Sequence, residues 1–108
     1  MRNALSVDVE DWFQVGAFEK VIARDSWETL PRRVEANTDR VLALFDEAGV
    51  KATFFTLGWV ALRHPALVRR IAEAGHELAS HGWDHQRVFT LDEAQFRADI
   101  GRAREAIE

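Results

Sequence analysis

The sequence predicts an α/β fold built from parallel βαβ units. Short apolar segments at residues 4–9, 52–57 and 76–80 have the length of strands, and apolar residues recur at helical spacing between and after them. Strands that alternate with helices favour a parallel sheet with right-handed crossovers. The expected order is strand, loop, helix, strand, helix, strand, helix.

The first strand, residues 4–9, is followed by a long segment without regular periodicity. Residues 12–29 contain seven large apolar side chains but no clean helical or strand repeat. This composition does not suit a free linker, because linkers are poor in aromatic residues. We therefore predict a loop, or irregular helical turns, that packs on the domain.

Two helices are predicted on either side of the second strand. Pro31 suits a first helical position, an apolar stripe follows over residues 34–45, and Gly49 suits a C-terminal cap. A further helix is expected to begin near Pro65 and to end at Gly75.

The last helix is predicted to run to the end of the chain. Thr90 and Glu93 have the spacing of a capping box, and apolar residues follow at spacings of four, three and four up to Ile107. Three parallel strands do not close a barrel, which needs roughly 250 residues. We therefore expect either a small open sheet or the first part of a larger domain.

Composition excludes several classes of protein. The 108 residues include 14 Lys and Arg against 18 Asp and Glu, so the net charge of −4 gives no basic surface for nucleic acid. The absence of cysteine excludes disulfides, thiolate zinc fingers and a cysteine nucleophile. No apolar run has the length of a signal core or a membrane span, so a cytoplasmic location without a membrane span is expected.

The candidate site residues follow the first and third strands. Asp8 and Glu10 come at the end of the first strand, and His81 and His85 follow the third. Parallel strands end at one edge, so the two clusters meet there. Two histidines and a carboxylate form a catalytic zinc set, and a second carboxylate can act as general base. Strand alternation puts Asp8 and Glu10 on one face, whereas a turn at Val9 would let Asp11 replace Glu10.

Each of these residues also has a purely structural interpretation. Acids at a strand end are often solvated turn residues, and an H-x-x-x-H pair alone is a weak signal. Trp83, between the two histidines, either packs in the core or forms the wall of a pocket. His64 and His76 are assigned no role at the site, and His76 is expected to make a local hydrogen bond.

Three segments in order resemble one known family. Residues 52–58 read ATFFTLG, residues 75–85 read GHELASHGWDH, and residues 6–13 read SVDVEDWF. The first two are similar to motifs of the NodB-type polysaccharide deacetylases, carbohydrate esterase family 4. The opening segment resembles a variant found in a subgroup linked to exosortase and exopolysaccharide loci, and in an allantoinase-like branch.

The resemblance implies a metal-dependent hydrolase that removes N-acetyl groups from amino sugars of an exopolysaccharide or a cell-wall glycan. Residues 1–108 would be the N-terminal part of a deacetylase domain with a distorted (β/α) barrel. His81 and His85 would bind a divalent metal, with zinc expected. Glu10 or Asp11 would be the third ligand, and Asp8 the catalytic base.

Further expectations concern the substrate and the completeness of the site. Trp83 is the candidate substrate-binding residue, because indole rings often line carbohydrate sites. The family's base-orienting arginine and general acid would fall after Glu108, so these 108 residues alone are expected to be inactive. Because three strands leave a sheet edge exposed, the 108 residues are expected either to self-associate through that edge or to be only part of what folds. The alternatives are a non-catalytic metal- or saccharide-binding module and an allantoinase-like amidohydrolase.

Overall fold

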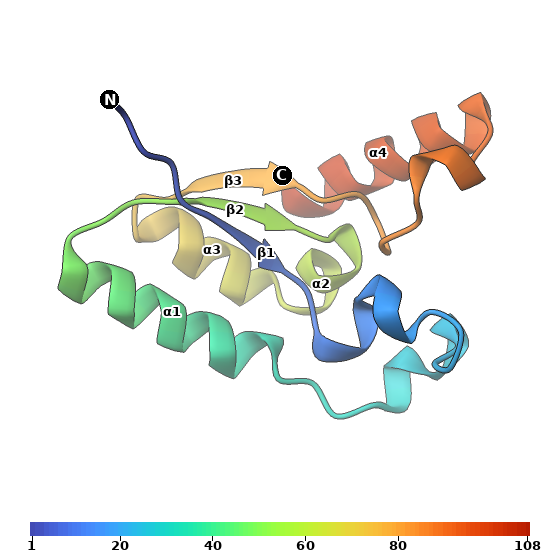
Figure 1. Cartoon of the computed structure of the whole chain (residues 1–108), viewed down its shortest axis with the longest axis horizontal. Coiled ribbons are helices and arrows are strands. Elements are labelled where there is room, and N and C mark those ends of the chain that lie inside the picture. Colours follow the sequence, from blue (N-terminus) through green and yellow to red (C-terminus); the bar gives the residue numbers. More distant parts are fainter.

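The computed structural model describes residues 1–108 and contains one parallel sheet (Figure 1). The sheet has three strands in chain order, β1 (Ser6–Val9), β2 (Thr53–Thr56) and β3 (Glu77–Ser80). Asp8, Phe55 and Ala79 are paired across it. All three strands therefore end at the same edge, and the predicted parallel α/β arrangement is confirmed.

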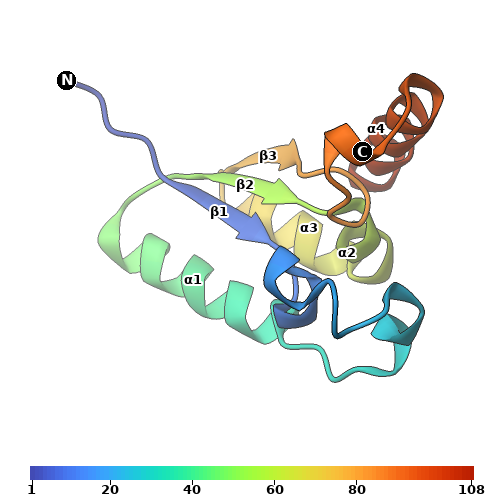
Figure 2. The ribbon, with the colours of Figure 1, turned by 45° about the vertical axis from the view of Figure 1, so that its right-hand side comes forward.

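Four helices connect or follow these strands. They are α1 (Val34–Ala48), α2 (Gly58–Arg63), α3 (Pro65–Glu73) and α4 (Glu93–Ile107). α1 and α3 lie side by side beneath the sheet, whereas α4 lies beyond β3 and packs against α2 (Figures 1 and 2). The short α2 was not predicted, because its six residues are too few to establish a helical repeat.

The two faces of the sheet are covered differently. Val9, Phe54 and Thr56 are buried on the side of the helices, where the Phe54 ring lies 6.1 Å from that of Phe45 in α1. Among the residues that alternate with them, Asp8 and Glu77 are exposed, whereas Thr53 and Phe55 are half-buried. The polar residues at the end of β1 therefore have one open side.

Residues 12–29 pack on the domain as predicted, in the form of three short 3₁₀ helices. These are η1 (Trp12–Gln14), η2 (Gly16–Phe18) and η3 (Arg24–Thr29). Phe13 and Trp27 are buried, and both rings contact Trp59 of α2 at centroid distances of 6.0 and 5.6 Å. Aromatic packing rather than helical periodicity therefore holds this segment in place.

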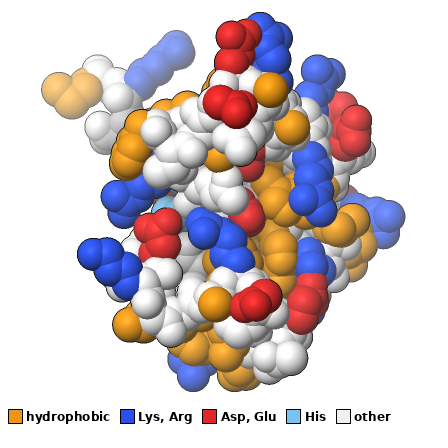
Figure 3. All heavy atoms as spheres, turned by 90° about the vertical axis from the view of Figure 1, so that its right-hand side faces the viewer, with side chains coloured by type: hydrophobic (Ala, Val, Ile, Leu, Met, Phe, Trp, Pro, Cys, Tyr) orange, Lys and Arg blue, Asp and Glu red, His pale blue; other side chains and the backbone are white.

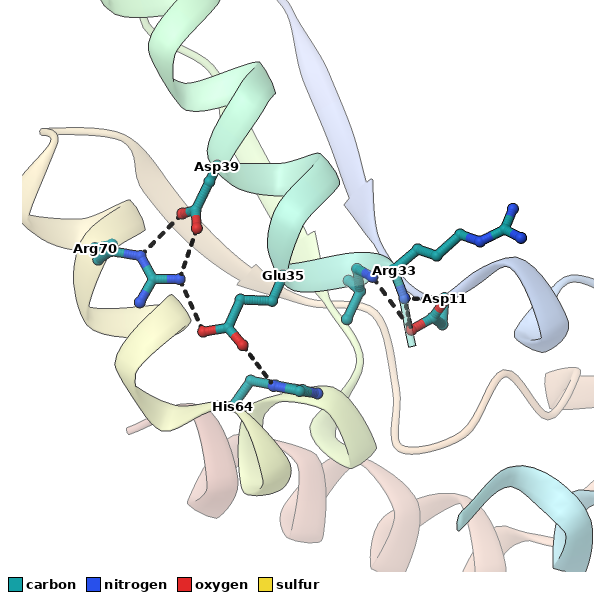
Figure 4. A network of polar contacts seen from close by, with 7 residues as sticks. Asp11, Arg33, Glu35, Asp39, His64 and Arg70 are labelled. Carbon is teal, nitrogen blue, oxygen red and sulfur yellow. Dashed lines mark hydrogen bonds and ion pairs between the residues drawn. The ribbon is translucent and has the colours of Figure 1, made fainter. Parts of the chain in front are cut away.

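Two predicted helix starts were wrong. α1 begins at Val34 rather than Pro31, because the Asp11 carboxylate accepts hydrogen bonds from the backbone N–H groups of Arg33 and Val34 (Figure 4). Before α4, the capping box is formed by Asp92 and Gln95 and not by Thr90 and Glu93. Thr90 instead ends the 3₁₀ helix η4 (Val88–Thr90).

Of three further local predictions, two are confirmed and one is wrong. Pro65 is the first residue of α3, and Gly49 ends α1 with a left-handed φ of 67°, as predicted. His76 does not bond locally: its Nδ1 accepts a hydrogen bond of 3.1 Å from the backbone N–H of Ala52. That contact joins the loop before β2 to the start of β3.

A polar network joins α1 to α3 at the surface (Figure 4). Arg70 Nε lies 2.9 Å from Asp39 Oδ1, and its Nη2 lies 3.0 Å from Glu35 Oε1. Glu35 Oε2 also lies 3.4 Å from His64 Nδ1. His64 is thus placed beside α1, on the far side of the sheet from Asp8.

Apolar surface remains outside the core. Figure 3 shows the face at the right-hand side of Figure 1, where hydrophobic side chains gather in a band between charged ones. Large exposed apolar residues include Phe18, Val21, Val88 and Phe89. None of the helices combines the length and apolar character needed to cross a bilayer.

Candidate metal centre

The strand ends bring two distant segments of the chain together. Glu10 directly follows β1, and His81 directly follows β3, where its backbone N–H extends the sheet by donating to Thr56 O at 2.9 Å. Glu10 Oε2 lies 3.2 Å from His81 Nε2 and 3.3 Å from His85 Nε2. Asp8 Oδ2 lies 3.8 Å from the same His81 nitrogen.

Glu10, His81 and His85 have the arrangement of a cation site. One ligand atom from each lies within 4.8 Å of the other two. Glu10 Oε2 and His81 Nε2 are buried, yet neither has a hydrogen-bond partner. Unpartnered buried polar atoms are rare in folded proteins. A donor set of two imidazole nitrogens and one carboxylate oxygen matches the catalytic zinc sites of other folds, so these residues fit a divalent metal.

The electrostatics of the cluster favour positive charge. Contact with the Glu10 carboxylate raises the pKa of His81 above its usual range, against the opposing effect of burial, and the charge of Asp8 acts in the same direction. The Glu10 side chain is only 15% exposed, whereas that of Asp8 is 55% exposed. Asp8 is therefore the carboxylate of this cluster that solvent reaches most easily.

The loop after β3 is held mainly by α2. The backbone N–H groups of Gly58 and Trp59, at the start of that helix, donate to Gly82 O and Trp83 O at 2.9 Å each. Asp99 in α4 accepts from the Trp83 N–H at 3.2 Å. Hydrogen bonds with α2 and α4 thus hold the backbone of Gly82 and Trp83, the two residues after His81.

The second histidine has an uncommon backbone conformation. His85 is the only residue other than glycine with a positive φ, at 67°. Such conformations cluster at functional sites, because the surrounding structure must enforce them. In this conformation, His85 Nε2 lies 3.3 Å from Glu10 Oε2.

Asp11 lies outside the cluster, although it is adjacent to Glu10. Its side chain is buried, with the residue 1% exposed, and accepts hydrogen bonds from the backbone N–H groups of Trp12, Arg33 and Val34. Of the two carboxylates that the sequence left open as a third ligand, only Glu10 reaches the histidines. Asp11 instead joins η1 to the start of α1.

Trp83 lies in the hydrophobic core. The residue is 7% exposed, and the Arg102 guanidinium stacks 3.6 Å from the centre of its ring. Its remaining exposed atoms line a hollow between the 83–91 loop and α4, with Gln95 and Asp99. Trp83 is thus a core residue that also borders this hollow, and the hollow includes none of Glu10, His81 and His85.

Two charged residues near the loop were not anticipated from sequence. Arg24 lies 3.4 Å from Asp84, and Asp99 holds the backbone of Trp83. Burial raises the pKa of Asp84, and the charge of Arg24 opposes this effect. No local pattern marks either residue, because Arg24 lies in an irregular segment and Asp99 lies within an ordinary helical repeat.

The fold and cluster together define an α/β protein with a candidate divalent-metal centre at the carboxyl ends of its strands. Residues 23–108 match the polysaccharide deacetylase family, and the chain belongs to this family. The resemblance of the strand motifs to this family is thereby confirmed.

Two similar proteins are named as deacetylases, one of peptidoglycan and one of chitooligosaccharides. The peptidoglycan-N-acetylglucosamine deacetylase PgdA of Listeria monocytogenes is 45% identical over 51 residues, which are 47% of this chain and 11% of that protein. A chitooligosaccharide deacetylase of Rhizobium leguminosarum bv. trifolii is 39% identical over 70 residues, covering 65% of this chain and 33% of that protein. The chain thus spans a third or less of the length of these two relatives.

Solved structures share the fold over almost the whole chain. A protein of Mycobacterium smegmatis assigned to the polysaccharide deacetylases superposes with a TM-score of 0.76 at 31% identity, covering 97% of this chain and 37% of that one. A family 4 carbohydrate esterase from Streptomyces lividans gives a TM-score of 0.70 at 25% identity, covering 96% and 42%. The chain therefore has the fold of one part of the (β/α) barrel of these enzymes.

Proposed function

We propose that the protein is a metal-dependent hydrolase that removes N-acetyl groups from amino sugars of a polysaccharide, such as an exopolysaccharide or a cell-wall glycan. Family membership and the two named deacetylases support the reaction class. The observation that carries the proposal is the convergence of Glu10, His81 and His85, two of them with unpartnered buried donor atoms, beside a more exposed Asp8.

Three residues of this site would hold the metal. Glu10 offers Oε2, and His81 and His85 each offer Nε2, which is the ligand set that zinc accepts with further positions open. A bound divalent ion supplies a Lewis acid for the acetamide carbonyl and lowers the pKa of water. The three ligand atoms already lie within 4.8 Å of one another, so they need little rearrangement to hold an ion.

Asp8 acts as the general base. Its carboxylate is partly exposed and lies beside the cluster rather than within it. Its Oδ2 accepts the proton of the water whose oxygen adds to the carbonyl carbon. The C–N bond of the acetamide then breaks as its nitrogen takes up a proton, which gives acetate and the free amine of the sugar. No residue of the chain is assigned to the protonation of that amine.

The test measures acetate release and metal content in the full-length protein. The unsubstituted protein with zinc is expected to release acetate from N-acetylated chitooligosaccharide or peptidoglycan, and a chelator to abolish the release. Asp8→Asn should retain the metal but lose a factor of ~10²–10⁴ in rate. His81→Ala should lose both. His64→Ala, which alters a histidine beside α1, is the matched control and should lose neither.

Two results would contradict the proposal in different ways. Metal binding without acetate release from any N-acetylated glycan would identify a non-catalytic binding module. Full metal content and activity in His81→Ala would remove the cluster from the reaction altogether.

A further inference from the structure

A charged contact connects the irregular segment 12–29 to the loop that carries His85. Arg24, the first residue of η3, donates from Nε to the backbone oxygen of Asp84 at 3.3 Å. The same nitrogen lies 3.4 Å from Asp84 Oδ2. The two residues are 60 positions apart in sequence, so this contact exists only in the folded chain.

Arg24 hydrogen-bonds the part of the loop that receives no hydrogen bond from α2 or α4. The hydrogen bonds from these helices end at Trp83. At Asp84, the contact with Arg24 is the one hydrogen bond to the backbone. The Asp84 carbonyl belongs to the peptide group that precedes His85, so its orientation bears directly on the φ angle of His85. That angle is the uncommon one, at 67°.

The residues that surround His85 on the side of Arg24 also belong to the irregular segment 12–29. A small hollow of about 10 Å³ is lined by His85 and otherwise only by residues of the range 13–27, among them Gln14 and Trp27. The Arg24 guanidinium lies 5.5 Å from the centre of the Trp27 ring, which helps to fix its position. The segment is therefore a support for the second histidine of the cluster.

We propose that Arg24 is a positioning residue for the metal centre. It holds the Asp84–His85 peptide so that His85 Nε2 stays 3.3 Å from Glu10 Oε2. This inference rests on the proposed function only in that it requires Glu10, His81 and His85 to bind a metal. It gives residues 12–29 a role in the site, since the rest of that segment anchors Arg24 to the core.

The test is the zinc affinity of Arg24→Ala in the full-length protein, measured by competition with a chromophoric chelator. Loss of a residue that orients a ligand typically lowers metal affinity 10–100-fold, and we expect a loss in this range. With cobalt in place of zinc, the absorption spectrum should also change, because one imidazole ligand is no longer held. A merely structural residue would leave that spectrum unchanged.

Arg32→Ala is the matched control. Arg32 lies just after η3, pairs with Glu28 at 2.9 Å and stacks 5.1 Å from the Trp59 ring centre, but has no contact with the loop 81–85. This variant should lose thermal stability comparable to that of Arg24→Ala while keeping its zinc affinity and cobalt spectrum.

Two further variants keep the test decisive if Arg24→Ala does not fold. Arg24→Lys keeps the charge but lacks the Nε–H group that bonds the carbonyl, so its zinc affinity should be intermediate. Asp84→Asn keeps that carbonyl and removes only the side-chain charge, so its affinity should fall less than that of Arg24→Lys.

The outcomes separate this inference from the proposed function. Unchanged zinc affinity and cobalt spectrum in the Arg24 variants, with metal bound normally by the unsubstituted protein, would overturn the role of Arg24 alone. Failure of the unsubstituted protein to bind zinc or cobalt would overturn the proposed metal site and this inference with it.

Discussion

Asp11 and Glu10 are adjacent acids for which we predict opposite phenotypes. The Asp11 carboxylate accepts three backbone N–H groups, with distances of 3.0 Å from Trp12, 3.0 Å from Arg33 and 3.2 Å from Val34. Replacing it with alanine leaves all three donors without a partner, two of them at the N-terminal end of α1. The perturbation therefore acts on the connection between β1 and α1 and not on the metal cluster.

The magnitude follows from the number of bonds lost. A hydrogen bond to a charged group contributes about 1.5–3 kcal/mol, so three bonds set an upper bound of roughly 9 kcal/mol. Local relaxation and entry of water reduce this, and we expect Asp11→Ala to lower the free energy of unfolding by about 3–5 kcal/mol. Asp11→Asn should cost about 2 kcal/mol, because the amide keeps one acceptor oxygen.

Glu10→Gln is the matched comparison. Glu10 Oε2 has no hydrogen-bond donor, and its close contacts are the two imidazoles. We expect this variant to change the free energy of unfolding of the metal-free protein by less than about 1 kcal/mol while losing zinc affinity. Urea unfolding in the presence of a chelator measures the first quantity, and competition titration with zinc measures the second.

The refuting result is an exchange of the two phenotypes. If Asp11→Asn kept the stability of the unsubstituted protein and lost zinc binding, while Glu10→Gln bound zinc normally, Asp11 would be the ligand. The assignment of the two carboxylates argued from their contacts would then be wrong.

Three further predictions concern stability. Burial and the charge of Lys51 lower the pKa of His76 in the folded protein below its ordinary 6.5. The contribution of neutral His76 to the free energy of unfolding is therefore fully present above pH 6.5, and it is lost as the pH falls from 6.5 towards the pKa of the folded state. His76→Asn, whose amide oxygen can accept from Ala52, should therefore show a weaker decline in unfolding free energy between about pH 7 and about pH 5, and an unchanged decline would count against this. Gly58→Ala should destabilise the protein by about 1–3 kcal/mol, because the added Cβ would lie 2.5 Å from Trp83 Cε3. Gly101→Ala in α4 is the comparison: its added Cβ meets open space, and the variant should be more stable by about 0.5–1 kcal/mol. Thermal unfolding that ranks the two variants the other way round would contradict the packing argument. Arg70→Ala should cost about 1 kcal/mol or less, with the difference shrinking in about 1 M NaCl, and a loss insensitive to salt would mean that the pairs with Glu35 and Asp39 are not what stabilises the α1–α3 contact.

The sequence alone predicts those elements that are marked by a hydrophobic repeat or by a residue with a strong backbone preference. The three strands, the helices α1, α3 and α4, and the glycine that ends α1 follow from hydrophobic repeats and backbone preferences. Parallel order then required the strand ends to share an edge, so the meeting of Glu10 with His81 was predictable from topology. The family resemblance added the expected roles of these residues but not their contacts.

Helix boundaries and the choice between neighbouring acids needed the tertiary structure. Nothing local distinguishes Glu10 from Asp11, since both are acids at the end of a strand. The difference arises because the chain returns at residues 33 and 34 and presents N–H groups to Asp11. The same long-range contact decides that α1 begins at Val34 and not at Pro31.

The support of His85 was decided by tertiary structure alone. Its left-handed backbone is unfavourable for a histidine, so no local preference predicts it. Arg24 reaches the preceding carbonyl only because Phe13 and Trp27 pack their irregular segment against α2. Sequence by itself determined which residue types are available at the strand ends; folding decided which of them converge, because hydrogen bonds and packing between segments 60 residues apart set the final geometry.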